Sequence, residues 1–465
     1  MAQQTYKKLN NIHMIGIGGT GMSGIAEVLL NLGYNVSGTD ISPNEATKRL
    51  KRLGAKISIG HAAKRVIGSD VVVVSTAISE ENIEVQEARR RKIPVIPRAE
   101  MLAELMRMKY GIAIAGSHGK TSTTSMIARV LEQAGFDPTV VVGGRLKTVG
   151  GHGKLGAGDW IVAEADESDR SFLYLSPFIS VLTNLDDEHL DHYKSLEEIK
   201  DTFIHFANKV PFYCPIVLCL DDSNLQSLIP SLERRIITYG FSTQTDIFAR
   251  NPKFDAFSST STVYWKDKKL AELKLNVPGK HSIYNAMAAI CVALDLEISP
   301  SLIFEGLEQY DGIGRRFELK AEINEIMIVE DYAHHPTEIK ATLEAAKNGW
   351  PRRIVSIFQP HRYTRLHLLM KSFIRAFNQA DVLILTDIYP AGEKAIPGVS
   401  GKALYEGIQN FGHNHLVFEP SLEKIPAVIR KIVQPKDLII VMGAGSIYRI
   451  IPDIIRALGG KTRGR

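Results

Sequence analysis

The stretch from residue 112 to residue 135 restricts the fold of this 465-residue chain more than any other. An apolar segment at residues 112–115 is typical of a buried strand, and it leads into the loop Gly116-Ser117-His118-Gly119-Lys120-Thr121. An amphipathic stretch then continues to Gly135, which predicts a helix. Backbone N–H groups at the start of such a helix, together with its dipole, bind a phosphate group. The segment therefore predicts an α/β domain that holds a nucleoside triphosphate.

The loop also supplies the side chains that nucleotide chemistry requires. Lys120 can reach the β- and γ-phosphates, and the Thr121 hydroxyl can bind the Mg²⁺ that bridges them. The loop is shorter than the standard phosphate loop, because Ile114 stands where the first glycine would be. An ordinary strand–helix turn is the alternative interpretation. The other residues expected to contact ATP here are Gly116, Ser117, His118, Gly119 and Ser122.

Length and composition exclude several classes of protein. The chain is too long for one core, and its 45% apolar and 23% charged residues are ordinary for a globular protein. A net charge of +5, with basic runs that lack aromatic residues between them, argues against a nucleic-acid partner. No apolar run approaches the roughly 18 to 20 residues that a membrane span needs. Three cysteines form no disulfide framework, so we expect a cytoplasmic protein. The small positive net charge fits small anionic substrates.

Three α/β segments follow one another along the chain, with a hinge at residues 311–317 between the second and the third. The first carries strands at 12–15, 34–38 and 71–74 and a helix at 99–107. The second has strands at 160–164, 179–183 and 216–220, antiparallel strands within 246–275 and a helix at 282–294. The third alternates helices with strands at 326–330, 354–358, 382–386 and 438–442. This pattern predicts an α/β fold with parallel sheets.

A second glycine motif lies in the first segment. Residues 16–21, Gly16-Ile17-Gly18-Gly19-Thr20-Gly21, fit G-x-G-x-x-G between a strand and a helix, and Asp40 ends the next strand. Such a motif binds a pyrophosphate, and the acid binds a ribose hydroxyl. A nicotinamide dinucleotide and a UDP-sugar both supply these groups, so the motif alone does not choose between them.

Acidic residues follow two strands of the central segment. Glu164 opens the run at residues 164–169, and the run at residues 183–191 contains His189. Open α/β sheets place ligands at the carboxyl ends of their strands, and Mg²⁺ prefers oxygen ligands shared with substrate phosphates. Both runs beside a phosphate loop predict magnesium sites, although a solvated turn is the alternative for each.

Two strand ends of the third segment carry polar and aromatic residues. Asp331-Tyr332-Ala333-His334-His335-Pro336-Thr337-Glu338 lies between a strand and a helix, and Phe358-Gln359-Pro360-His361-Arg362-Tyr363-Thr364-Arg365 follows the next strand. Two arginines beside a histidine and a tyrosine suit the binding of a carboxylate or a phosphate. Structural salt bridges are the alternative for these arginines.

Together these motifs resemble the Mur ligases, and the similarity extends over nearly the whole chain. The runs at residues 334–338 and 358–363 are similar to the branch that adds L-alanine, whereas the branch that reuses a tripeptide is not similar there. Further segments that carry the resemblance are Ser75-Thr76-Ala77-Ile78, Arg98-Ala99-Glu100-Met101, Gly279-Lys280-His281 and Gly314-Arg315-Arg316-Phe317.

The resemblance implies three domains and an ATP-dependent ligase of peptidoglycan precursor synthesis. A Rossmann-like domain at residues 1–108 would bind UDP-N-acetylmuramate, and a P-loop domain at 109–316 would bind ATP. A Rossmann-like α/β domain at 317–465 would bind L-alanine and close on ATP. ATP would phosphorylate the muramyl carboxylate, and the amine of L-alanine would attack the acyl phosphate.

The resemblance also implies a role for each site residue. ATP would contact His281, Asn285, Arg316 and Asp331 beside the phosphate loop, and Mg²⁺ would be bound by Thr121, Glu164 and His189. The UDP-sugar site would comprise Gly18, Gly19, Thr20, Gly21, Asp40, Ser75, Thr76 and Ala77, and the amino-acid pocket Tyr332, His335, Arg362 and Arg365. Lys120, His189, Arg316, His335 and Arg362 would be catalytic.

Two other classes of function remain as alternatives. A nicotinamide-dependent dehydrogenase would use the glycines at residues 16–21 but would leave the phosphate loop, Glu164 and His189 without a role. A P-loop switch or motor-like protein would use the phosphate loop but gives no reason for the histidines and arginines of the third segment.

Overall fold

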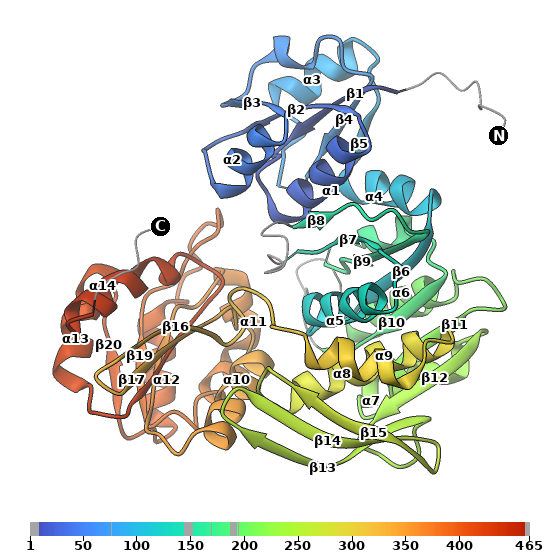
Figure 1. The fold of residues 1–465 in the computed structure, drawn as a ribbon. Helices are drawn as coiled ribbons and strands as arrows, with labels where there is room; N and C mark the ends of the chain where they lie inside the picture. Colours follow the sequence, from blue (N-terminus) through green and yellow to red (C-terminus); the bar gives the residue numbers. More distant parts are fainter. Residues whose placement is uncertain are drawn as a thin grey trace.

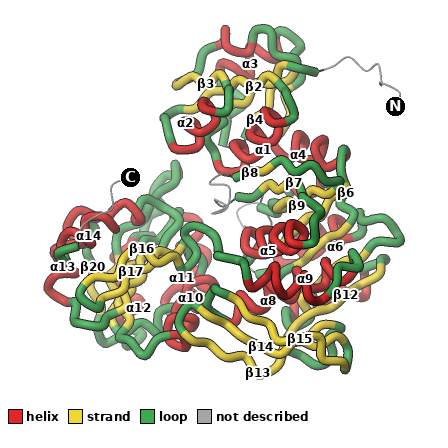
Figure 2. The backbone as a smooth tube through the Cα atoms, viewed as in Figure 1, coloured by secondary structure: helices red, strands yellow, loops and turns green. Residues whose placement is uncertain are grey.

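In the computed structural model, the chain is described over residues 9–75, 77–143, 152–168, 170–186, 193 and 195–460. Its strands form three sheets that follow one another along the sequence. Figure 1 shows the first sheet at the top, the second at the lower right and the third at the left, and Figure 2 shows helices packed around each of them. The predicted α/β class with three domains is confirmed.

The first sheet contains five parallel strands in the order β3-β2-β1-β4-β5. The order reverses beside β1, and the glycine loop follows the carboxyl end of that strand, which is where open α/β sheets bind ligands. The strands are β1 (Asn11–Ile15), β2 (Asn35–Asp40), β3 (Lys56–Ile59), β4 (Val71–Val74) and β5 (Val95–Pro97). The helices are α1 (Thr20–Asn31), α2 (Glu45–Arg52), α3 (Ile83–Arg90) and α4 (Arg98–Arg107).

The second sheet contains ten strands, and its centre is parallel. The predicted antiparallel strands form one edge as β13 to β15. The strands are β6 (Tyr110–Ala115), β7 (Thr139–Val141), β8 (Gly153–Lys154), β9 (Trp160–Glu164), β10 (Ile179–Leu182), β11 (Pro215–Cys219), β12 (Arg235–Gly240), β13 (Ile247–Asp255), β14 (Ser258–Trp265) and β15 (Lys268–Leu275). The helices are α5 (Lys120–Gln133), α6 (Leu196–Ala207), α7 (Ser223–Leu228), α8 (Lys280–Asp295) and α9 (Pro300–Glu308).

The third sheet has the order β16-β17-β21-β18-β19-β20, and β16 is its antiparallel edge. The sequence did not predict β16, which is half exposed and carries charges. The strands are β16 (Glu318–Ile323), β17 (Ile326–Asp331), β18 (Ile354–Phe358), β19 (Val382–Leu385), β20 (Leu416–Phe418) and β21 (Leu438–Met442). The helices are α10 (Pro336–Gly349), α11 (Tyr363–Ile374), α12 (Gly401–Asn410), α13 (Ile425–Ile432) and α14 (Ile451–Ala457).

The clusters of buried apolar side chains do not coincide with the three sheets. A single cluster of buried side chains contains Met14 of the first sheet together with Ile112 of the second. The third sheet has separate clusters on its two faces, because neighbouring residues of a strand point to opposite sides: Ile440 and Val441 belong to different clusters. One face of the first sheet therefore shares a core with the second sheet, whereas its other face and the third sheet have clusters of their own.

Two expectations from composition concern membranes and cysteines. Within the described part of the chain, every helix is too short or too polar to cross a bilayer. All three cysteines are free thiols; Cys219 and Cys291 are buried, whereas Cys214 is only partly buried.

Candidate active site

The phosphate loop joins β6 to α5 and depends on two glycines. Gly116 and Gly119 have φ angles of +135° and +82°, a region that side chains strongly disfavour. A Cβ atom on Gly116 would lie 2.1 Å from Thr183 Oγ1, and one on Gly119 would lie 2.7 Å from Asn285 Oδ1. Both positions therefore require glycine for backbone conformation and for space.

The segment after β10 holds this loop in place. The His118 amide donates a hydrogen bond to Asn184 Oδ1 (2.8 Å), while Thr183 Oγ1 and Asn184 Nδ2 donate to the His118 carbonyl (2.7 and 3.0 Å). The Asp186 amide donates to Ser117 Oγ (2.9 Å). These contacts preorganise the loop, a role that the sequence did not predict for this acidic segment.

Two acids, Glu164 at the end of β9 and Glu167 three residues later, face the start of α5. Lys120 Nζ lies 2.7 Å from Glu167 Oε1, and burial raises the pKa of Glu167 to about 7 although the lysine opposes this rise. Glu164 forms a hydrogen bond with Thr121, and burial raises its pKa as well. Within the described residues, the buried Glu164 Oε1 has no hydrogen-bond partner. A carboxylate oxygen enclosed in this way favours a cation beside it.

Glu164 and Thr121 fit a magnesium ion. Both are hard oxygen donors, they lie next to the phosphate loop, and Mg²⁺ takes few protein ligands because it keeps waters and substrate phosphates. His189, the third predicted ligand, lies outside the described residues, so its place relative to this pair stays a prediction.

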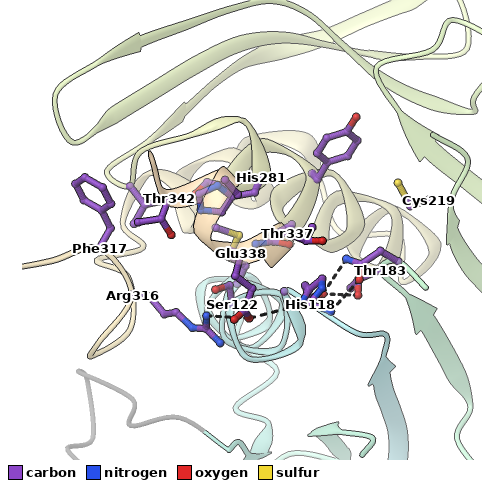
Figure 3. Close-up of a pocket in the computed structure, with 18 of the residues that line it drawn as sticks. His118, Ser122, Thr183, Cys219, His281, Arg316, Phe317, Thr337, Glu338 and Thr342 are labelled. Carbon is purple, nitrogen blue, oxygen red and sulfur yellow. Dashed lines mark hydrogen bonds and ion pairs between the residues drawn. The ribbon is translucent and has the colours of Figure 1, made fainter. Parts of the chain in front are cut away.

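A cavity of about 460 Å³ lies between the central and third domains (Figure 3). Seven of the residues predicted to bind ATP line it: His118, Gly119, Ser122, His281, Asn285, Arg316 and Asp331. The other four predicted ATP residues belong to the phosphate loop and the first turn of α5, outside that lining: Gly116, Ser117, Lys120 and Thr121. The cavity thus brings together residues from distant parts of the chain.

One end of the cavity is aromatic and polar. His281 lines the cavity with part of its ring exposed, and desolvation by the surrounding protein, helped by the charge of Arg316, lowers its pKa to about 4, so the imidazole is neutral near pH 7. The Tyr284 hydroxyl donates to Asp221 Oδ2 (2.8 Å) at the same end. The sequence analysis missed Tyr284 and Asp221, because nothing in their local pattern separates them from a helix face and a turn.

Asp331 and the arginines at the start of the third domain have distinct partners. The Asp331 carboxylate accepts hydrogen bonds from the amides of Phe317 (2.8 Å) and Ala333 (2.7 Å), so it fixes the segment that enters the third domain. Arg315 pairs with the buried Glu330 (2.6 Å) of the same domain, whereas Arg316 lines the cavity. The contact of Asp331 with the ATP ribose stays a prediction.

The predicted amino-acid pocket contains a chain of rings in the third domain. The rings of Tyr332 and His334 are 5.2 Å apart, and those of His334 and His361 are 5.9 Å apart. Arg365 lies 3.2 Å from His361 Nδ1, and His361 stacks on Tyr389. Burial and the neighbouring His334 lower the pKa of His361 to about 3. The structure thus connects the predicted Tyr332 and Arg365 through two histidines.

The other two predicted members of the pocket have partners outside this chain of rings. Arg362 Nε donates to Glu393. His335 is buried at the start of α10, where its Nδ1 accepts a hydrogen bond from the Thr337 amide (3.3 Å) and its ring lies 4.7 Å from that of His118. His335 therefore faces the phosphate loop.

Asp186 lies where the third domain meets the phosphate loop. Its Oδ2 is 3.2 Å from His118 Nε2 and 3.6 Å from His335 Nδ1, and it accepts a hydrogen bond of 2.5 Å from the Thr337 hydroxyl. Burial opposes ionisation of Asp186, but these donors and charges hold its pKa below the usual range. No individual role could be predicted for Asp186 from the sequence, because two of its partners, His335 and Thr337, belong to another domain.

The predicted UDP-sugar site surrounds the start of α1. The Gly18 amide donates to Asp40 Oδ2 (2.9 Å), and Gly19 precedes the helix without a side-chain cap, so the first helical N–H groups can face an anion. The helix begins at Thr20 and Gly21. Asp40 therefore holds the glycine loop, and its contact with the uridine stays a prediction.

The remaining members of this site are three consecutive residues after β4. The Ala77 amide donates to Ser75 Oγ (3.2 Å), which closes a short turn. Thr76 lies outside the described residues.

Three family models match the chain in succession. Residues 11–110 match "Mur ligase family, catalytic domain", residues 114–293 match "Mur ligase middle domain", and residues 315–445 match "Mur ligase, glutamate ligase domain".

Individual relatives agree with these models. A protein of Syntrophotalea carbinolica named UDP-N-acetylmuramate–L-alanine ligase is 54% identical over 445 residues, which are 96% of this chain and 97% of the relative. The solved structure of a UDP-N-acetylmuramate–alanine ligase from Thermotoga maritima has a TM-score of 0.82 and 29% identity, covering 96% of this chain and 98% of that one. A murein peptide ligase from Psychrobacter arcticus has a TM-score of 0.72 and 26% identity, covering 98% of this chain and 100% of that one.

Proposed function

Since the chain belongs to the Mur ligase family, we propose that it joins L-alanine to the carboxylate of UDP-N-acetylmuramate at the expense of ATP. The product would be a precursor of peptidoglycan. The observation that carries the proposal is the cavity between the phosphate loop and the third domain, where His118 and Arg316 converge. An acyl-transfer enzyme needs such a meeting point, because the nucleotide, the acid and the amine must react at one place.

ATP would bind with its phosphates on the loop at residues 116–121 and its base beside His281. Lys120 and Arg316 would bind the phosphate oxygens, and the neutral His281 imidazole can donate or accept one hydrogen bond at the base. Glu164 and Thr121 would hold Mg²⁺, with His189 as the proposed ligand of a second ion. The metal would supply charge neutralisation for the phosphates.

The other two substrates would come from the outer domains. The glycines at residues 18–21 would bind the pyrophosphate of the UDP-sugar at the start of α1, with Asp40 and the residues 75–77 near the uridine. Tyr332, His335, Arg362 and Arg365 would bind the amino acid and the muramyl group. A guanidinium that donates two parallel hydrogen bonds suits the carboxylate of L-alanine. The amine is the only other charged group of this amino acid.

The chemistry proceeds through two displacements. A carboxylate oxygen of the muramyl group attacks the γ-phosphorus, and the bond to the ADP oxygen breaks. The neutral amine of L-alanine then attacks the carbonyl carbon, phosphate leaves with the electrons of the former C–O bond, and the proton that the nitrogen loses passes to the phosphate or to solvent. Lys120, Arg316 and Arg362 would hold the negative charges that develop, which is the main catalytic requirement of both steps.

Neither alternative function accounts for these contacts. A dehydrogenase has no need of the cavity beside the phosphate loop, and a P-loop switch has no need of the His334–His361 ring pair. We also place the reaction in the cytoplasm, where ATP is abundant and three free thiols stay reduced.

The test supplies ATP, Mg²⁺, UDP-N-acetylmuramate and radiolabelled L-alanine, and measures labelled nucleotide-sugar product together with ADP. We expect one ADP per product and slow ADP release when either co-substrate is omitted. Replacing L-alanine with the tripeptide L-alanyl-γ-D-glutamyl-meso-diaminopimelate tests the other branch of the family. Product from the tripeptide alone, or ADP release that does not depend on the sugar nucleotide, would contradict the proposal.

A further inference from the structure

Glu338 occupies an unusual place between the two active-site regions. It lies in the first turn of α10, three residues after His335, which precedes the helix. Its side chain is only 10% exposed. Most charges in a helix's first turn face solvent and complement the helix dipole, so a buried acid there needs partners.

The two oxygens of this carboxylate face different parts of the site. Oε1 lies 3.5 Å from His118 Nδ1 on the phosphate loop and 3.3 Å from the Arg316 guanidinium at the domain junction. Figure 3 shows these three side chains converging from separate elements. One oxygen thus contacts the groups proposed to hold the nucleotide phosphates.

Oε2 contacts the loop that carries the proposed amino-acid pocket. It accepts a hydrogen bond from the His334 amide (3.1 Å) and lies 3.2 Å from His334 Nδ1. The His334 ring in turn packs against Tyr332 and His361. The second oxygen thus contacts the backbone and the ring around which that pocket is built.

The partners of Glu338 keep it ionised. Burial opposes the charge, but His334, Arg316 and His118 hold the pKa of this carboxyl well below its usual range. An ionised carboxylate only accepts hydrogen bonds, and here Arg316 donates to Oε1 while the His334 amide donates to Oε2. Both oxygens are therefore used as acceptors at once.

We propose that Glu338 is a positioning residue that sets the amino-acid loop of the third domain relative to the phosphate loop through His118, Arg316 and His334. The inference rests on the proposed function. It assigns Glu338 no contact with the reacting atoms: the residue fixes where the amine stands with respect to the acyl phosphate.

A purely structural salt bridge would have a different signature. It would lower stability and affect every substrate equally, whereas a positioning role affects the step in which the amine attacks. Glu338→Gln keeps the shape but replaces one acceptor oxygen with an NH₂ donor. Either orientation of the amide then turns a donor toward His118 and Arg316 or toward the His334 amide.

The experiment measures steady-state kinetics of Glu338→Gln against Glu344→Gln, an exposed acid on the same helix. We expect kcat/KM for L-alanine to fall by about 10²-fold in Glu338→Gln, since a misplacement of about 1 Å has that effect. KM for UDP-N-acetylmuramate should match that of Glu344→Gln, because the proposed UDP-sugar site lies in the first domain. Equal losses in the two variants, or a loss shared by all three substrates, would overturn the inference.

A double-mutant cycle with His118→Asn tests the coupling itself. Because both residues act through one contact, the double variant should lose less activity than the product of the two single losses. Losses that simply multiply would contradict the inference. If Glu338→Gln does not fold, His334→Asn replaces it: kcat/KM for L-alanine should fall while KM for ATP is kept, and an unchanged value for L-alanine would refute the coupling.

Failure of this inference is distinguishable from failure of the proposed function. Wild-type protein that makes the alanyl product while Glu338→Gln behaves like Glu344→Gln refutes only the role of Glu338. Wild-type protein that makes no product refutes the function.

Discussion

The first and third domains are attached to the central domain in opposite ways. The first domain shares an apolar core with the central one, and their backbones touch: a Cβ atom on Gly24 of α1 would lie 2.6 Å from the His152 carbonyl oxygen, and one on Gly153 of β8 would lie 2.3 Å from the Gly24 oxygen. Arg98 adds an ion pair of 3.0 Å with Asp166. Close-packed backbone of this kind has no second arrangement available to it.

The third domain meets the central one through polar side chains around a cavity and through the Ala256 amide, which donates to the Gly349 carbonyl at the end of α10 (2.9 Å). His118, Asp186, Thr337 and Glu338 form the contacts beside the phosphate loop. A smaller apolar contact lies at the far end of α10, where the Trp350 ring is 4.9 Å from that of Phe257 in the turn after β13.

The difference indicates which domain moves. Breaking a polar contact costs little free energy, because water replaces the lost hydrogen bonds. Separating a shared apolar core costs roughly 25 cal/mol for each Å² of apolar surface that becomes exposed. We infer that the first and central domains act as one body and that the third domain opens and closes on it. The glycines at 312 and 314 lie in the junction, and Gly312 has a φ of +78°.

The largest expected effect is on catalysis at the phosphate loop, and it should leave UDP-sugar binding by the first domain nearly unchanged. Lys120→Ala removes a positive charge from the phosphate loop and should lower kcat by about 10²-fold or more. Calorimetry should show UDP-N-acetylmuramate affinity within about 3-fold of wild type, because that site lies on the other side of the shared core. If the folded variant lost UDP-sugar binding, the two sites would not be independent.

A smaller effect tests the close contact at the first interface. Gly24→Ala should destabilise the joint unit by about 1–3 kcal/mol, although alanine normally favours a helix over glycine, because the added carbon meets backbone. Gly407→Ala on α12 is the matched control, since its nearest atoms belong to the flexible Ile374 side chain. Thermal unfolding measures both. A Gly24→Ala variant as stable as its control would refute the tight contact.

The apolar contact of the third domain should matter less. Phe257→Ala removes the ring pairs with Trp350 (4.9 Å) and Phe317 (6.2 Å), each of which contributes about 0.5–1.5 kcal/mol. We expect the melting transition of the first and central domains to stay in place while KM for L-alanine rises, because docking of the third domain weakens. Phe257→Leu should restore part of the loss. Equal destabilisation of all domains would mean that this interface is as rigid as the first.

The smallest expected effect concerns the protonation state of His281, which lines the cavity. With a pKa of about 4, His281 is already neutral throughout the ordinary histidine range of about 6–7 and gains a proton only in more acidic solution. The ratio of ATP affinities of wild type and His281→Gln should therefore be constant from about pH 6 to pH 8. A ratio that changes near pH 6.5 would show that the protein does not hold His281 neutral.

The fold was largely predictable from local pattern, and the interfaces were not. The β-branched run at β4 and the loop at Gly116 identify a buried strand and a phosphate-binding turn within a few residues of sequence. The contact between Gly24 and Gly153 has no such signal, because each glycine is explained by its own helix or strand until the two are brought together.

The candidate site shows the same limit. The sequence selected Asp40 and Asp331 as ligand contacts, whereas the structure shows each accepting backbone hydrogen bonds, from Gly18 and from Phe317 and Ala333. Both roles are open to one acid, and the choice depends on which N–H groups the fold brings near it. Glu338 was part of a recognised motif, but its partner His118 is in another domain.

The most direct test measures distances between the domains in solution. Spin labels at Lys51, Glu233 and Lys431, all exposed, report the first, central and third domains in a Cys214→Ser background. Distances are recorded without ligand and with a non-hydrolysable ATP analogue plus UDP-N-acetylmuramate. We predict a narrow Lys51–Glu233 distribution that ligands leave unchanged, and a broad Glu233–Lys431 distribution that ligands narrow. A Lys51–Glu233 distance that shifts with ligand, or a Glu233–Lys431 distribution that is narrow and fixed, would contradict the account.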